Sequence, residues 1–181
     1  MILQSNPHVQ DTLTKEFSEI IKEKYCYVST NYKGESMALS NMEQEVELPD
    51  SNIIKLSSEK IRCTEILFEP SINNVNEKPI HDLIQECINS LDLKINKELY
   101  SNIYLSGGNT LFEGFQERLT TSLETLISNQ TQIQIIAPIE RKYSIWIGGS
   151  ILTSLDTFKS LWITSKEYQE CGQSIIFRKS F

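Results

Sequence analysis

Apolar side chains recur at intervals of three and four residues in the first part of the chain. Within residues 11–28, Leu13, Phe17, Ile20 and Ile21 fall on one face of a helix with this spacing. The pattern predicts an amphipathic helix. It ends at an aromatic cluster before NYKGES, where a glycine breaks the period.

The next stretch is polar and mixed, with two short apolar runs. EVEL and NIIKL flank the turn-forming residues 49–52, which predicts a small β-hairpin. A loop rich in Asn and Pro follows, and a second amphipathic helix is predicted over 79–91. Its periodic apolar positions are Ile80, Leu83, Ile84, Cys87, Ile88 and Leu91.

Strand-like and helix-like segments alternate further along the chain. IYLSGG at 103–108 indicates a buried strand that ends in a turn, and residues 109–127 indicate a helix capped by Asn109 or Thr110. QIQIIA at 132–137 indicates another short strand. Strands followed by helices predict an α/β architecture.

The last segment opens with a second Gly-Gly pair, at 148–149, which we interpret as a second turn. Short helices capped by Ser, Thr and Asp are expected after it. No repeat period is visible in the chain.

Composition and charge exclude several classes of function. The chain has 181 residues, 39% of them hydrophobic, and a formal charge of −7 without any Lys/Arg-rich run. This suits one globular domain or two small ones, and it argues against nucleic acid as a partner. No window approaches the roughly 20 apolar residues that span a bilayer, and the start lacks the basic region of a signal peptide. We therefore expect a soluble, intracellular protein with no membrane partner.

Cysteines and histidines give no sign of a metal site or a catalytic triad. The cysteines lie far apart without a C-x-x-C pair, so we interpret them as reduced thiols. Neither histidine has the neighbours of a nucleophile and base pair. These residues are Cys26, Cys63, Cys87, Cys171, His8 and His81.

The strand, Ser-Gly-Gly and helix junction at 103–110 can bring backbone close to a ligand. Glycine lacks a Cβ and tolerates positive φ, and a helix start presents unpaired N–H groups. A nucleotide suits such a junction. A bare tight turn is the commoner meaning of a Gly-Gly pair, and both interpretations stay open on the spacing alone.

Longer stretches resemble a known family. IYLSGGNTLFEGFQERL, IIAPIERKYSIWIGGSILTSLDTFKSLWITSKEYQECG and SIIFRKSF closely resemble the C-terminal half of actin. IKEKYCYV and KIRCTEILFEPS resemble earlier stretches in the same order. The resemblance covers nearly the whole chain and identifies it as a member of the actin family.

The resemblance implies a set of nucleotide-binding residues. Gly107 and Gly108 match positions beside the phosphates and sugar, where glycine amides can donate hydrogen bonds. Lys22 and Glu23 match positions beside the adenine and ribose, although a solvated helix face is the alternative for this pair. The wall of the base pocket is matched by Leu111, Phe112 and Lys142.

The matched region holds one wall of the family's nucleotide site. The phosphate-binding hairpins, the metal-orienting carboxylates and the water-positioning glutamine precede this region in the family, and no D-x-G-x-G-like pattern occurs here. We therefore expect no catalytic residue, no metal ligand and no ATP hydrolysis by this chain alone. ATP or ADP is an expected cofactor, with Mg²⁺ if a second chain supplies the other half-site.

The resemblance also implies protein partners. In the family, the C-terminal helices pack on a sheet built by the N-terminal half, so a companion chain, a second copy or an unrelated subunit should cover the apolar residues here. Four positions match one side of a target-binding cleft, with simple core packing as the alternative for each: Leu152, Leu155, Thr157 and Leu161. Asp92 matches a longitudinal filament contact, but Lys94 reverses the neighbouring charge, so co-polymerisation is doubtful.

The expected fold is the C-terminal half of the actin and sugar-kinase (ribonuclease H-like) fold, an α/β fold with a small helical-hairpin subdomain. Its expected parts are a small subdomain over 1–76, an α/β subdomain over 77–143 and a helical tail over 144–181. The first hypothesis for function is a cytoskeletal, cytoplasmic actin-like subunit of a larger assembly, with a nuclear or ciliary one left open. The alternatives are a split actin that hydrolyses ATP with a companion chain, and a truncated fragment.

Overall fold

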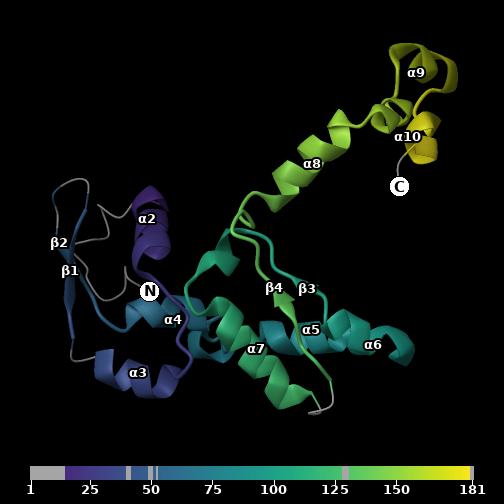
Figure 1. The fold of residues 1–181 in the computed structure, drawn as a ribbon. Coiled ribbons are helices and arrows are strands. Elements are labelled where there is room, and N and C mark those ends of the chain that lie inside the picture. The colour runs from purple at the N-terminus through teal and green to yellow at the C-terminus, as the bar shows by residue number, and fades with distance from the viewer. Residues whose placement is uncertain (1–14, 40–41, 49–50, 52, 128–130, 180–181) are drawn as a thin grey trace.

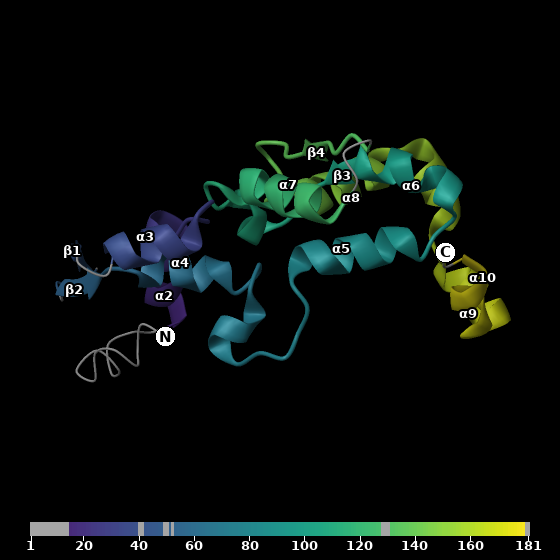
Figure 2. The same ribbon diagram turned by 90° about the horizontal axis from the view of Figure 1, so that it is seen from below.

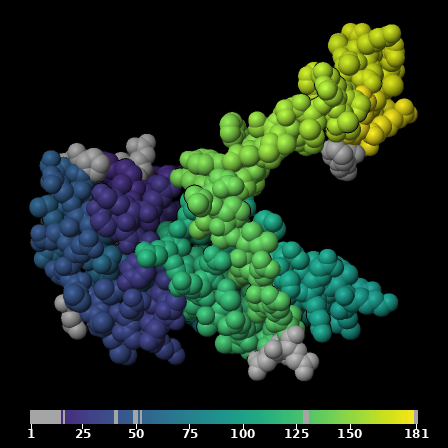
Figure 3. Space-filling model, viewed as in Figure 1, coloured from purple at the N-terminus to yellow at the C-terminus, as the bar shows by residue number. Residues whose placement is uncertain are grey.

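The computed structural model describes residues 15–39, 42–48, 51, 53–127 and 131–179. In Figure 1, the elements from α2 to β4 form a body, and the segment from α8 to α10 projects from it as a narrow arm. Figure 3 shows the same arm in space-filling form, leaving the body near the start of α8. The candidate site lies in the body.

The first part of the body joins a helix to a β-hairpin. The predicted helix is confirmed as α2 (Lys15–Tyr25), and the predicted hairpin as the antiparallel strands β1 (Gln44–Glu47) and β2 (Ile53–Leu56). Residues 11–14, 49–50 and 52 of these predictions lie outside the described residues. Their shared core consists of Ile21, Val46, Leu48, Ile54 and Leu56, with Phe17 and Tyr25 packed against it. Alternate hairpin positions face this core, as a half-buried strand requires.

Two short helices in this part were not predicted. They are α3 (Tyr32–Leu39) and α4 (Glu59–Glu65). Helix α4 buries Ile61 and Thr64, and the single hydrogen of the Thr64 hydroxyl is shared between the backbone carbonyls of Ile61 and Tyr27. Tertiary packing therefore stabilises a helix whose seven residues are too few to show a clear apolar period.

The second part of the body packs helices against a minimal parallel sheet. Helix α5 (Ile80–Asn89) confirms the second predicted amphipathic helix, and α6 (Leu93–Tyr100) follows it (Figure 2). Strands β3 (Ile103–Tyr104) and β4 (Ile135–Ile136) pair in parallel, with α7 (Phe115–Leu126) between them in sequence. The core consists of Val28, Phe68, Leu105, Phe115, Leu119, Leu123 and Ile135.

This core takes residues from both sides of the expected subdomain limit near residue 76. Val28 and Phe68 precede that limit, and they pack in one cluster with Leu105 and Phe115. The rings of Phe68 and Phe115 are tilted, with centroids 5.6 Å apart. The subdomain limits near 76 and 143 stay predictions.

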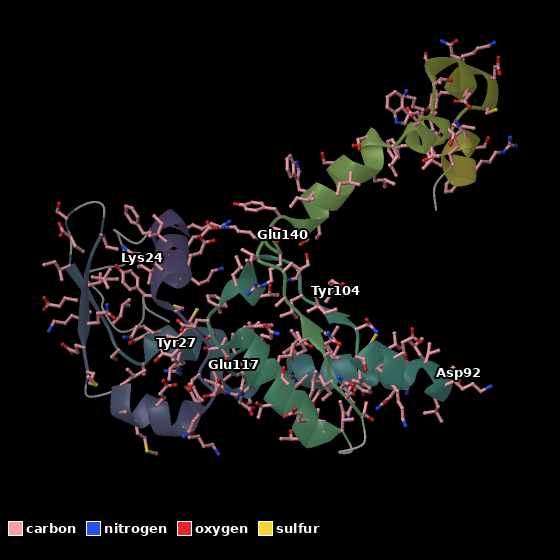
Figure 4. The ribbon with its side chains drawn as sticks, viewed as in Figure 1. Lys24, Tyr27, Asp92, Tyr104, Glu117 and Glu140 are labelled. Atoms are coloured by element: carbon pink, nitrogen blue, oxygen red, sulfur yellow. The ribbon has the colours of Figure 1, made fainter. Side chains whose placement is uncertain are left out.

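The segment after β3 differs from its prediction. The strand is shorter than IYLSGG, and Tyr104 points into solvent (Figure 4). Neither Asn109 nor Thr110 caps α7, because residues Gly108–Leu111 form a 3₁₀ turn, η3, and α7 begins at Phe115 after Gly114. Gly114 has φ +78°, and a Cβ there would lie 2.3 Å from the carbonyl oxygen of Val28. The close crossing of Val28 therefore sets the start of α7.

The second Gly-Gly pair does not form a turn. Gly148 and Gly149 lie inside α8 (Ser144–Ser154), where the apolar residues on either side continue the helix. The short helices expected after this point are confirmed: η4 (Asp156–Leu161), α9 (Ser165–Cys171) and α10 (Ser174–Lys179). Thr164 and Glu167 form a capping box at the start of α9.

Candidate functional site

A cavity of about 670 Å³ lies between the end of α2 and the loops that follow β3 and β4. Its size is that of a pocket for a small ligand. The seven residues matched to the nucleotide site line it together: Lys22, Glu23, Gly107, Gly108, Leu111, Phe112 and Lys142. Its other lining residues are Glu19, Lys24, Cys26, Ser106, Asn109 and Glu113. The fold thus brings three distant segments to one place.

Gly107 forms the turn at the base of the cavity. Its φ of +95° is in the region that favours glycine, and its amide donates a hydrogen bond of 2.8 Å to the carbonyl of Arg141. A Cβ at Gly107 or Gly108 would meet nothing within 4 Å, so there is room for a larger side chain at both positions. Glycine is favoured at Gly107 because of its backbone conformation. The amide of Gly107 is engaged within the protein, which differs from the ligand hydrogen bond that we expected of it.

Arg141, which no sequence pattern singles out, holds this turn in place. Its Nη2 and Nε donate to the carbonyl of Thr110 at 3.1 and 3.3 Å, and its Nη1 donates to that of Pro138 at 2.9 Å. One guanidinium therefore joins the loop after β3 to the loop after β4. Both loops line the cavity, so Arg141 sets its shape from behind.

Two side-chain contacts cross from α2 to these loops. Lys142 Nζ lies 2.9 Å from Glu23 Oε1, and Lys22 Nζ donates to Asn109 Oδ1 at 3.3 Å. The hydrogen bond with Lys142 and its charge lower the pKa of Glu23, and the same contact raises the pKa of Lys142. Both residues are exposed, so the ion pair is weak, and a charged ligand can replace one partner of the pair at a small cost in free energy.

The lining combines cations with an apolar wall. Lys22, Lys24 and Lys142 supply positive charge, and three glutamates of the lining offset it, whereas Leu111 and Phe112 offer apolar surface. A planar aromatic base can stack on the apolar wall, and an anionic tail can pair with the lysines, so the residues present are compatible with an adenine nucleotide. In the part of the chain that the structure describes, no three His, Cys, Asp or Glu side chains are grouped to hold a metal ion.

The candidate partner-binding residues separate into two places. Leu152, Leu155, Thr157 and Leu161 follow one another along the end of α8 and η4. Asp92 lies at the free end of α6, away from the arm (Figure 4). There it caps the helix, because its carboxylate accepts a hydrogen bond of 3.0 Å from the amide of Lys94.

Helix α8 is the most apolar helix described, and none of its residues is buried. Ile145 is 81% exposed and Trp146 is 74% exposed, and the apolar residues Ile151, Leu152 and Leu155 continue the surface. Phe158 and Trp162 form an edge-to-face pair just beyond it, with centroids 6.4 Å apart. We call the exposed residues of α8 and η4 the arm surface.

Helix α8 has 11 residues, and across the described ranges no helix combines the length and the apolar character that crossing a bilayer needs.

Comparison with protein families tests the resemblance. The sequence model of the family described as Actin matches residues 4–181, nearly the whole chain. The mixed helix and strand content agrees with an α/β fold of the actin type. The chain therefore belongs to the actin family.

Proposed function

We propose that this actin-family chain is a structural subunit that works by binding other proteins within a larger assembly. The observation that carries the proposal is the arm surface, an apolar helix without a buried residue. Contiguous apolar surfaces of this kind mark interaction sites. We propose further that the chain corresponds to the C-terminal half of the fold, in which another chain supplies the cover.

The size of the arm surface supports this role. Fully burying a large apolar side chain contributes about 1.5–3 kcal/mol. Trp146, Ile145, Ile151, Leu152 and Leu155 are all about half exposed or more, so covering them is worth roughly 5–10 kcal/mol. That is comparable with the cost of association, estimated at about 4–15 kcal/mol. The arm surface alone therefore about balances that cost, and stable binding requires the partner to bury apolar surface of its own as well.

The second candidate function is that of a split actin, in which this chain and a companion bind and hydrolyse ATP jointly. The cavity favours this candidate, because all seven matched residues line it. We propose that the chain alone binds the base side of an adenine nucleotide without hydrolysing it. A companion would have to supply the phosphate-binding hairpins and hold Mg²⁺.

Native mass spectrometry of the protein from its own source tests both candidates. Unrelated protein partners without nucleotide support the structural subunit. A one-to-one partner resembling the N-terminal half of actin, together with an adenine nucleotide mass, supports the split enzyme. A stable monomer contradicts the role that we give to the arm surface. Fractionation with the cytoskeleton tests the cytoplasmic, cytoskeletal location that we propose with this role.

A direct binding measurement separates the cavity from the arm. We expect Trp146→Ala to weaken partner binding and to leave nucleotide affinity unchanged, because Trp146 lies on the arm surface and the cavity is in the body. Phe177→Ala is the matched control, since Phe177 is an exposed aromatic residue in α10. Equal loss of partner binding in both variants would show that the effect is not specific to the arm surface.

A further inference from the structure

Cys26 and Cys63 are brought together where the chain leaves α2 and passes α4. The amide of Tyr27 donates to the carbonyl of Lys60 at 3.3 Å, and the Thr64 hydroxyl donates to the carbonyl of Tyr27. Figure 4 labels Tyr27 in this crossing. The two bonds place the segment after α2 against the part of α4 that carries Cys63, so the two thiols are close enough for each to shift the pKa of the other.

The two thiols have different surroundings. Cys26 is 8% exposed, and its hydrogen bond to Cys63 together with burial raises its pKa. Cys63 is half-buried, and the hydrogen bond from Cys26 together with the charge of Lys22 lowers its pKa to about 6. Lys60 adds positive charge from α4. At neutral pH the pair is therefore a protonated Cys26 beside a Cys63 thiolate.

The pair suits redox chemistry better than metal binding. A structural metal site needs four ligands, and in the described portion of the chain no third ligand joins these two sulfurs. A thiolate with partial solvent access beside a second thiol is the arrangement of redox-reactive cysteines. Cys87 and Cys171 are also free, but they lie exposed in α5 and α9, where they serve as internal references.

We propose that Cys26 and Cys63 form an oxidisable dithiol, which a hydroperoxide converts into an intramolecular disulfide that links the end of α2 to α4. The Cys63 thiolate attacks a peroxide oxygen, the O–O bond breaks, and Cys63 becomes a sulfenic acid. The hydroxide released takes the proton of Cys26 to form water. The Cys26 sulfur then attacks Cys63, the S–O bond breaks, and a second hydroxide leaves and is protonated. The two thiols lose two electrons, and hydrogen peroxide is reduced to two waters.

The position of the pair gives this oxidation a structural consequence. Cys26 lines the cavity, one turn after Lys22 and Glu23. A disulfide would fix the end of α2 relative to α4 and so restrain that wall of the cavity. The proposal does not depend on which ligand the cavity binds.

The test uses the 181-residue chain with the two reference cysteines removed, as Cys87→Ser with Cys171→Ser. After peroxide treatment and blocking of free thiols, we expect an intact mass lower by two hydrogens. Trypsin should release residues 25–33 linked to 63–94, and the Cys87→Ser change leaves a single thiol in the second peptide. Both thiols remaining free, or sulfinic acid on Cys63 without a link, would overturn the proposal.

Single variants and a rate profile assign the roles. In the test chain, Cys26→Ser should stop at a sulfenic acid on Cys63 that dimedone traps. In Cys63→Ser, the remaining thiol of Cys26 should oxidise no faster than Cys87 does in the unsubstituted chain. If a variant fails to fold, the parent chain still decides by its rate of alkylation with iodoacetamide. At pH 6 about half of Cys63 is thiolate, against about 0.3% of an ordinary thiol. The lower basicity of the Cys63 thiolate reduces its intrinsic reactivity about tenfold. The net alkylation rate of Cys63 at pH 6 should therefore be about tenfold higher in the folded chain than in the urea-unfolded chain.

Near pH 9 Cys63 is mostly thiolate in both the folded and the unfolded chain. Its alkylation should then be about tenfold slower in the folded chain, the reverse of the order at pH 6. Rates that rise in parallel with pH in the folded and unfolded chain would show that Cys63 is an ordinary thiol. That result would also overturn the proposal.

Discussion

A buried ion pair between α4 and α7 gives the sharpest prediction about the stability of the body. Arg118 Nη2 lies 2.7 Å from Glu65 Oε1, and Nη1 donates to Glu65 Oε2 at 3.2 Å and to the carbonyl of Ser29 at 2.6 Å. The guanidinium also lies 5.1 Å from the ring centroid of Phe68. Because the side chain of Glu65 is 3% exposed, it has almost no access to water if Arg118 is removed.

We expect Arg118→Met to lower the free energy of unfolding by about 3 kcal/mol. Breaking a buried pair costs about 3–5 kcal/mol, and the lower end applies because the Arg118 side chain keeps 19% of its exposure. Burial raises the pKa of Glu65, while Arg118 opposes that rise, so removing Arg118 raises this pKa further. The variant can then relieve the lone charge by taking up a proton.

The sign of the pH dependence follows from this proton. A carboxyl whose pKa is raised in the folded state contributes stability below its unfolded pKa, and the contribution is lost as pH rises through the folded pKa. The deficit of Arg118→Met should therefore be largest at neutral pH and smaller near pH 5. Glu65→Gln with Arg118→Met should recover part of the loss, since no charge remains buried.

Urea unfolding followed by far-UV circular dichroism measures these differences. Tryptophan fluorescence is unsuitable, because Trp146 and Trp162 both lie in the arm. Lys55→Met is the matched control: Lys55 and Glu43 are also 2.7 Å apart, but both are more than half exposed, so the loss should stay below about 1 kcal/mol. Equal losses in the two variants, or a deficit that does not change with pH, would refute the reasoning.

Three further predictions concern the turns, the cavity and the arm. Gly114→Ala should destabilise the chain by more than about 1 kcal/mol, because Gly114 has a positive φ and lies against the Val28 carbonyl. Gly148→Ala, in open space within α8, should instead stabilise the chain by about 0.4–1 kcal/mol. Thermal unfolding of the two variants measures both differences. Lys142→Met should weaken ATP binding about tenfold in calorimetry by removing a charged donor, and unchanged affinity would exclude Lys142 from the site. Hydrogen bonds from Lys179 and Thr164 lower the pKa of Glu167 to about 2, so α9 should lose this support as pH falls from about 4.5 towards 2, and amide exchange that stays slow there would contradict it.

The strongly periodic segments were predictable from the sequence. Helices α2 and α5 carry enough apolar positions on one face to define the period, and the hairpin has turn-forming residues between two apolar runs. Each of these signals is local. These elements could therefore be predicted without knowledge of any long-range contact.

The elements that sequence reasoning missed depend on distant contacts. Helix α4 is held by Tyr27 and by the pair with Arg118, and the start of α7 is set by the carbonyl of Val28. None of these partners is close in sequence. The Gly-Gly pair at 148–149 favours a turn because such pairs commonly mark turns, but the apolar residues around it continue the helix and outweigh that preference.

The candidate site shows the same division. The resemblance to actin selected seven residues, and the fold places all of them around one cavity. It did not select Arg141, which orders two of the lining loops, or the contact between Lys142 and Glu23, which are 119 residues apart. A family pattern identifies positions, whereas the partner of each side chain depends on how the fold brings the segments together.

The arm and the cavity both support the companion chain that we propose. Helix α8 has only 11 residues, two of them glycine, so it is marginal in water without packing, and nothing within the described residues removes Ile145 and Trp146 from water. The amide of Gly107 is engaged with the carbonyl of Arg141, so in the nucleotide site that we propose a companion would have to supply donors for the phosphates. The arm surface and the cavity are connected by the segment 138–146, where the loop after β4 passes from the cavity into α8. A companion that covers the start of α8 therefore lies beside the cavity, and we expect partner binding and nucleotide binding to be coupled through Lys142 and Tyr143.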